Sequence, residues 1–189
     1  MTQEQIAAFV HGFFSKDVFV FHEWPLLPVD SSPGVPFGLN RTVNCKGGGS
    51  ANFAGTATIG VSASIRHMDL AGVLAATRCT FTADGITITL DADGSLEQEG
   101  RLDFAVAEDV EDPSLSFALR SFGDFNWSVD HSWAAGEIDW SGSCPMDLTL
   151  TADVSLEAIR GSDSRGSVTG TVCWRHIQET VSVFGNSVS

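Results

Sequence analysis

The stretch GEIDWSGSCPMDLTLTADVSL, residues 136–156, decides the fold of this 189-residue chain. From residue 138 onward, every even position is apolar or small. These positions hold Ile138, Trp140, Gly142, Cys144, Met146, Leu148, Leu150, Ala152, Val154 and Leu156. The odd positions are polar, apart from Pro145. Because successive side chains of a strand point to opposite faces, this pattern predicts a sheet with one buried and one wet face.

The same alternation occurs in residues 51–65, and residues 73–83 are predicted to form the strand that returns beside them. Asp84–Gly85 is a hairpin signal, and Asp93–Gly94 predicts a second tight turn between strands at 86–90 and 96–106. Separate strands are also expected at 114–122 and 125–129. The predicted fold is all-β: an antiparallel β-barrel or two-sheet β-sandwich of about 10–12 strands with one short N-terminal helix.

The helix is expected over residues 2–15, where Ile6, Phe9, Val10, Phe13 and Phe14 follow the spacing of one apolar helix face. Thr2 and Gln5 fit a capping box at its start. Residues 24–38 are rich in proline, which cannot join a central ladder. The chain is therefore divided into a helix and Pro-rich arm over 1–38 and a β domain over 39–189.

The charge balance is strongly acidic, with 24 Asp and Glu against 10 Lys and Arg and a formal net charge of −14. Phosphate binding needs clustered cations, so nucleic acid is excluded as a partner, and anionic membrane surfaces are disfavoured. The chain contains no apolar run of about 18 residues, so no membrane-spanning helix is predicted. The opening MTQEQIAAF lacks the pattern of a signal peptide, which leaves a cytoplasmic protein and a removed signal as alternatives.

Four cysteines permit three disulfide pairings. Pairing Cys45 with Cys79 and Cys144 with Cys173 is favoured, because each bond would close one hairpin. The second pair conflicts with strict alternation, and a bulge or a break at Pro145 would resolve the conflict. Two disulfides would place the protein in an oxidising compartment, outside the cell or in a periplasm, with its signal removed.

A series of cysteine, glycine and strand residues occurs in a characteristic order along residues 44–173. The set comprises Asn44, Cys45, Cys79, Phe81, Gly85, Ile88, Cys144, Asp147, Leu148, Leu150, Val168, Gly170, Thr171 and Cys173. In this order it resembles a group of secreted bacterial β-rich proteins with four cysteines. The resemblance implies an exported, disulfide-bearing β domain and carries no known activity.

Motifs of catalysis are sparse: there is no GxSxG elbow, no phosphate-binding glycine loop with its lysine, and no dinucleotide fingerprint. The five histidines are dispersed, so no cofactor is expected. A weak calcium hypothesis rests on the acidic loop of Glu108, Asp109, Glu111 and Asp112. A glycoside hydrolase hypothesis rests on carboxylates that share the wet face of one strand, namely Glu97, Glu99 and Asp103.

Aromatic residues gather within 19 positions of the chain: Phe122, Phe125, Trp127, Trp133 and Trp140. They are either core or the lining of a pocket for a hydrophobic small molecule. We therefore expect a non-catalytic extracytoplasmic protein that binds an apolar ligand or a surface partner. The alternatives are an acidic hydrolase, or a structural subunit that forms homo-oligomers through residues 1–38, with Val18, Phe19, Val20 and Phe21 adding a strand to a neighbour.

Overall fold

The computed structural model of the protein describes residues 1–14, 33–62, 65–105, 114–130, 132–133, 136–137, 140–155 and 164–183. One α-helix, α1 (Gln3–Phe13), opens the chain. Its predicted capping box is confirmed: the Thr2 amide donates to Gln5 Oε1 over 2.8 Å, and the Gln5 amide donates to Thr2 Oγ1 over 3.2 Å. These two bonds satisfy amide groups that the first helical turn would otherwise leave without partners.

Eight strands form one antiparallel sheet in which each strand pairs with its neighbour in chain order. They are β1 (Pro36–Asn44), β2 (Ser50–Ser62), β3 (Ile65–Ala83), β4 (Ile86–Ala105), β5 (Ser114–Asp130), β8 (Trp140–Ser155), β9 (Arg165–Val172) and β10 (Arg175–Ser182). The two-residue strands β6 (Ser132–Trp133) and β7 (Gly136–Glu137) pair separately. The all-β class, the antiparallel pairing and the single N-terminal helix are therefore confirmed. Within the described ranges the sheet is not closed, and β1 and β10 are its edges.

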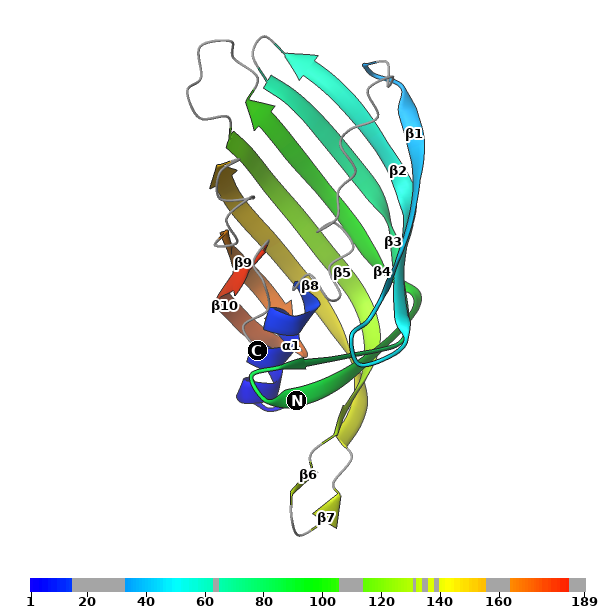
Figure 1. Ribbon diagram of the computed structural model, residues 1–189, viewed down its shortest axis with the longest axis vertical. Coiled ribbons are helices and arrows are strands. Elements are labelled where there is room, and N and C mark those ends of the chain that lie inside the picture. Colours follow the sequence, from blue (N-terminus) through cyan, green and yellow to red (C-terminus); the bar gives the residue numbers. More distant parts are fainter. Residues whose placement is uncertain are drawn as a thin grey trace.

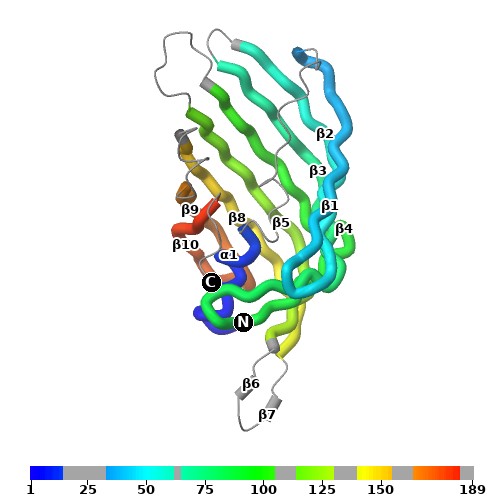
Figure 2. The backbone as a smooth tube through the Cα atoms, viewed as in Figure 1, coloured from blue at the N-terminus to red at the C-terminus, as the bar shows by residue number. Residues whose placement is uncertain are grey.

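The sheet is strongly curved, and α1 lies on its concave side near one end (Figures 1 and 2). The helix packs against β3, β4 and β10. Its buried residues Phe9 and Phe13 join one continuous apolar core with the inward-facing residues of the sheet. The helix and the first edge strand thus belong to the same packed body, and β1 begins at Pro36, before the predicted domain boundary. No helix in the described ranges has the length and apolar character that crossing a membrane requires.

β4 and β5 are each longer than the strands that the sequence predicts there, because positions predicted to separate two strands lie inside one. Gly94 has a φ of +70° within β4, where the pairing with β5 shifts register between Asp91 and Leu96. Gly123 has a φ of +131° within β5, and a side chain there would meet the carbonyl oxygen of Ser95. Both glycines accommodate irregularities that let very long strands twist and continue, so the predicted turn at Asp93–Gly94 is wrong.

The predicted division of β8 into a buried and a wet face is confirmed. Its even positions from Cys144 to Val154 are all buried, whereas the odd positions are exposed or half-buried. Trp140 and Gly142 are the exceptions, because both are exposed at the start of the strand, Trp140 by 48%.

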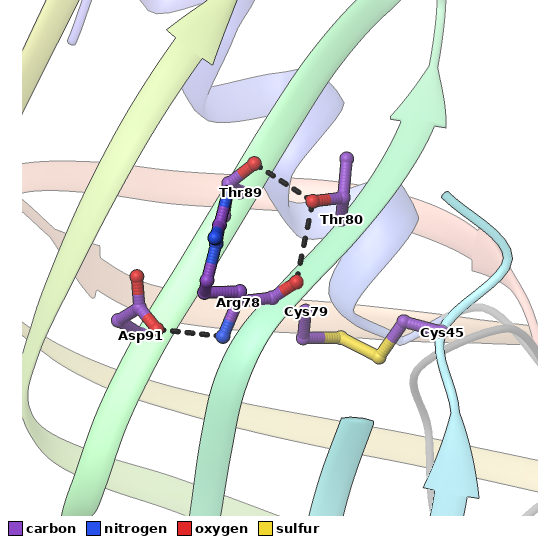
Figure 3. Close-up of a disulfide and its surroundings, with 6 residues drawn as sticks. All are labelled: Cys45, Arg78, Cys79, Thr80, Thr89 and Asp91. Carbon is purple, nitrogen blue, oxygen red and sulfur yellow. Dashed lines mark hydrogen bonds between the residues drawn. A yellow bond between two sulfur atoms is a disulfide. The ribbon is translucent and has the colours of Figure 1, made fainter. Parts of the chain in front are cut away.

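Both predicted disulfides are present. Cys45–Cys79 joins the loop after β1 to β3, with the two Cα atoms 5.3 Å apart (Figure 3). The loop is also tied to β3 by backbone bonds, from the Gly47 amide to the Thr80 carbonyl over 2.8 Å and from the Thr80 amide to the Gly48 carbonyl over 2.9 Å. The disulfide therefore fixes the first hairpin of the chain to the third strand.

Cys144–Cys173 joins β8 to the turn between β9 and β10, with the two Cα atoms 5.0 Å apart. The expected bulge or break at Pro145 is absent, because Pro145 keeps its regular pairing with Asp124. Instead Cys173 lies beyond the end of β9 with a φ of +48°. Cys173 is therefore outside the regular ladder, and alternation along β9 no longer determines where its side chain points.

Candidate functional site

The aromatic residues predicted to line an apolar pocket lie on both faces of the sheet. Phe125 and Trp127 are buried on the inner face, whereas Phe122 lies on the outer face, half-buried beside Asp147. Trp140 is largely exposed, and the side chain of Trp133 lies outside the described residues. The structure thus brings Phe125 and Trp127 together on one face but not all of the predicted set.

The inner aromatic residues are packed by the protein itself. Phe125 is stacked on Phe9 of α1, with ring centroids 4.8 Å apart and 12° between the ring planes. Trp127 lies over the backbone of Gly142, where an added Cβ would be 3.2 Å from its ring. These contacts make the two rings part of the core that holds the helix to the sheet.

A groove of about 590 Å³ opens over strands β5, β8, β9 and β10. We call it the outer groove. It is lined by Arg120, Asp147, Thr149, Thr169, Gly170, Thr171, His176, Ile177 and Gln178. The sequence predicted none of these residues as part of a binding site. Asp147, Gly170 and Thr171 were named only as strand or turn residues of the resemblance.

Strand register arranges the polar lining in two adjacent rows. One row runs from Arg120 through Thr149 and Thr169 to Gln178, each residue directly opposite the next across a pair of strands. The second row runs from Asp147 through Thr171 to His176 in the same way. Neighbouring strands are about 4.8 Å apart, and residues two apart along a strand are separated by about 7 Å. The outer groove therefore presents a regular grid of polar side chains.

Arg120 is fixed at the β5 side of this grid. Its Nε and Nη2 atoms donate to the two carboxylate oxygens of Asp147, both over 2.8 Å, and Nη1 donates to Glu99 over 3.1 Å. The guanidinium also lies 4.5 Å from the centroid of the Phe122 ring, which is a cation–π contact. A bidentate pair of this kind fixes the orientation of both partners.

The ion pair also shifts the pKa values of both Asp147 and Arg120. Hydrogen bonding from Arg120 lowers the pKa of Asp147 below its usual value, opposed by partial burial of the carboxylate and assisted by the positive charge of Arg120. The hydrogen bonds to Asp147 and then to Glu99 raise the pKa of Arg120 further. Both groups are therefore charged at neutral pH.

Other predicted site residues lie elsewhere. Glu97, Glu99 and Asp103 are on the outer face of β4, where Glu99 binds Arg120 and Asp103 binds Arg101 over 2.9 Å. The calcium hypothesis at Glu108, Asp109, Glu111 and Asp112 and the partner strand of Val18, Phe19, Val20 and Phe21 both fall outside the described residues. Among residues that the structure does describe, no cluster of three or more His, Cys, Asp or Glu could hold a metal ion.

The outer groove could not be found from sequence, because it depends on strand register. Alternation does place Asp147 and Thr149 on the wet face of their strand. It gives no sign that Thr169 and Gln178 continue the same row. The resemblance to secreted four-cysteine proteins stays a prediction, since no family model, no curated protein and no solved structure matches this chain.

Proposed function

We propose that this protein is a non-catalytic binding protein of the extracytoplasmic space, and that it holds a ligand or a surface partner in the outer groove. The observation that carries the proposal is the contrast between the two faces of the sheet. On the inner face, Phe125 is stacked on Phe9 of α1. On the outer face, a groove of about 590 Å³ is lined by a grid of polar side chains. The apolar-ligand hypothesis has less support, because two of the five rings meant to line its pocket, those of Phe125 and Trp127, contact the protein's own helix and backbone.

The ion pair supports binding over catalysis. A general acid or base works best with a pKa near the operating pH. Asp147 has its pKa lowered, and both of its oxygens accept from Arg120. Of the carboxylates in the hydrolase hypothesis, Glu99 and Asp103 are also held by arginines. These groups are suited to holding a ligand in place rather than to transferring protons.

The two disulfides support a location outside the cytoplasm, because such bonds persist in oxidising compartments. A second candidate function, the structural subunit, is favoured by the edge strands: in the described sheet β1 and β10 each pair on one side only. Edge strands can pair with a strand from another chain. Native mass spectrometry tests this candidate, which requires multimers at micromolar protein, whereas the binding proposal is met by a monomer.

The binding proposal is tested by two-dimensional amide NMR of the folded protein, titrated with a fragment mixture that spans apolar, polar, cationic and anionic compounds. We expect shift changes to concentrate on the amides of Thr149, Thr169 and Gln178. A compound of any class that perturbs only inner-face residues such as Phe125 and Trp127 would contradict the proposal. So would a mixture that perturbs nothing.

A further inference from the structure

We infer that the ligand of the outer groove is a neutral saccharide; this inference rests on the proposed function and names its ligand class. The argument starts from hydrogen-bonding groups that have no partner. In the described part of the chain, Thr149, Thr169 and Thr171 make no side-chain hydrogen bond, and neither do His176 and Gln178. Each threonine hydroxyl can donate one bond and accept two.

Two cross-strand pairs of threonines elsewhere on the outer face are bonded to each other. Thr80 and Thr89 hydrogen-bond each other over 2.8 Å, and Thr82 and Thr87 do so over 3.0 Å. Thr149 and Thr169 are opposite each other in the same kind of antiparallel pair, yet their hydroxyls are not bonded to each other. The hydroxyls of the outer groove are thus available to a ligand, whereas those of these two cross-strand pairs are bonded to each other.

The charges of the outer groove select against anions. Arg120 is the one arginine or lysine among the described lining residues, and three of its five N–H donors already serve Asp147 and Glu99. The three groups together carry one positive and two negative charges, and the whole chain has a net charge of −14. Among the described lining residues, a phosphate, sulfate or carboxylate would therefore meet only an arginine whose charge two carboxylates already offset. The grid suits a ligand with many hydroxyls and no negative charge, because hydroxyl groups can donate to Asp147 and exchange bonds with the threonines.

A tryptophan with a strained backbone lies in the hairpin turn between two strands of the outer groove. Trp174 is in the turn that joins β9 to β10, two residues from His176, and its side chain is 77% exposed. Its φ is +63°, a conformation that bulky residues rarely adopt and that this hairpin turn normally fills with glycine. Strain of this kind is retained at functional sites. An exposed indole in the turn that follows Thr171 and precedes His176 would give the apolar C–H face of a sugar ring a surface to stack on.

Isothermal titration calorimetry with named probes tests the inference. The neutral probes are cellohexaose, maltohexaose, mannohexaose, laminarihexaose and chitohexaose. The charged probes are an oligogalacturonate and a trilysine peptide. We expect at least one neutral hexasaccharide to bind and both charged probes to give no heat. Thr169→Val should weaken that binding by roughly 2- to 12-fold, the effect of one hydrogen bond. Thr56→Val is the matched control, because Thr56 is an exposed threonine of β2 away from the outer groove, and it should leave the affinity unchanged.

Trp174→Gly separates a binding role from a structural role. Glycine suits the positive φ, so this variant should have a higher melting temperature while its saccharide affinity falls by about tenfold or more. A lower melting temperature with unchanged affinity would overturn the role of Trp174. Binding of the trilysine peptide or the oligogalacturonate alone, with NMR shifts in the outer groove, would overturn the saccharide inference and leave the proposed function intact. Binding of a neutral hexasaccharide that perturbs only inner-face residues would overturn both.

Discussion

Phe9 of α1 and Phe125 of β5 stack with their ring centroids 4.8 Å apart, and neither side chain is more than 1% exposed. Phe9 also contacts Phe13, with centroids 5.5 Å apart. The helix is therefore joined to the concave side of the sheet by aromatic packing at its centre. This arrangement makes α1 a structural part of the β domain.

Replacing Phe9 with alanine should destabilise the whole protein. Removing a buried phenylalanine costs about 3–5 kcal/mol, because the transfer free energy is lost and a cavity remains. Urea unfolding followed by far-UV circular dichroism gives the free energy of unfolding. Phe9→Leu is the matched control and should cost clearly less. Equal stability of Phe9→Ala and the wild type would show that the helix is only loosely attached.

Each disulfide should contribute about 3–4 kcal/mol to the free energy of unfolding in the chain-entropy model, because the loops that they close have similar lengths. The sequence separations are 34 residues for Cys45–Cys79 and 29 for Cys144–Cys173. The double serine variants Cys45→Ser/Cys79→Ser and Cys144→Ser/Cys173→Ser should therefore lose similar stability in urea. A loss below about 1 kcal/mol in either variant would contradict this account of the bonds.

The buried pair Gln98 and Ser121 tests how much an unpaired polar group in the core costs in stability. Gln98 Nε2 donates to Ser121 Oγ over 2.9 Å, and the two residues are 3% and 0% exposed. Gln98 Oε1 has no hydrogen-bond partner among the described residues. Ser121→Ala should cost about 1–3 kcal/mol, because it leaves the amide nitrogen without a partner as well.

The double variant Gln98→Met/Ser121→Ala should recover most of that loss, since it removes the buried polar groups together. A double-mutant cycle in urea measures the coupling between the two positions. If the losses of the two single variants, Gln98→Met and Ser121→Ala, simply add, the two positions are not coupled, which contradicts the hydrogen bond between them.

The sequence predicted the faces of the strands better than their ends. Alternation in β8 is sufficient to place Leu148 and Leu150 inside, because a buried face tolerates no shift of one residue. Glycine was ambiguous, since a positive φ serves both a turn and an irregularity inside a long strand. Gly94 therefore predicted a turn where β4 continues, and β5 runs through Gly123, where two separate strands were expected.

The disulfide partners could be predicted because each pair closes a hairpin, whereas the conformation at Cys173 could not. The outer groove was beyond the sequence for a similar reason. Its two rows depend on β9 pairing with β8 so that Thr149 lies opposite Thr169. The strand register alone places Thr149 opposite Thr169, and no local sequence pattern predicts that register.

Asp147→Asn should lower the melting temperature at neutral pH, because it removes the charge that Arg120 holds. The pKa of Asp147 is lowered in the folded protein from an ordinary value of 3.8. The stabilisation is therefore complete above about pH 4 and is lost as the pH falls from 3.8 through the lower folded pKa. Melting curves of wild type and variant should converge in acid. Asp153→Asn, on the same face of β8, is the control, and a gap that persists at the lowest pH would contradict the ion-pair explanation.

One measurement tests the central claim most directly: fluorine NMR of protein labelled with 5-fluorotryptophan, titrated with the hexasaccharide that binds. Trp127 reports the inner face and Trp174 the hairpin at the outer groove, and single Trp→Phe variants assign the resonances. The account predicts that the Trp174 resonance shifts with saturation while that of Trp127 stays fixed. A shift of Trp127 with an unmoved Trp174 would place the ligand in the interior and contradict the account.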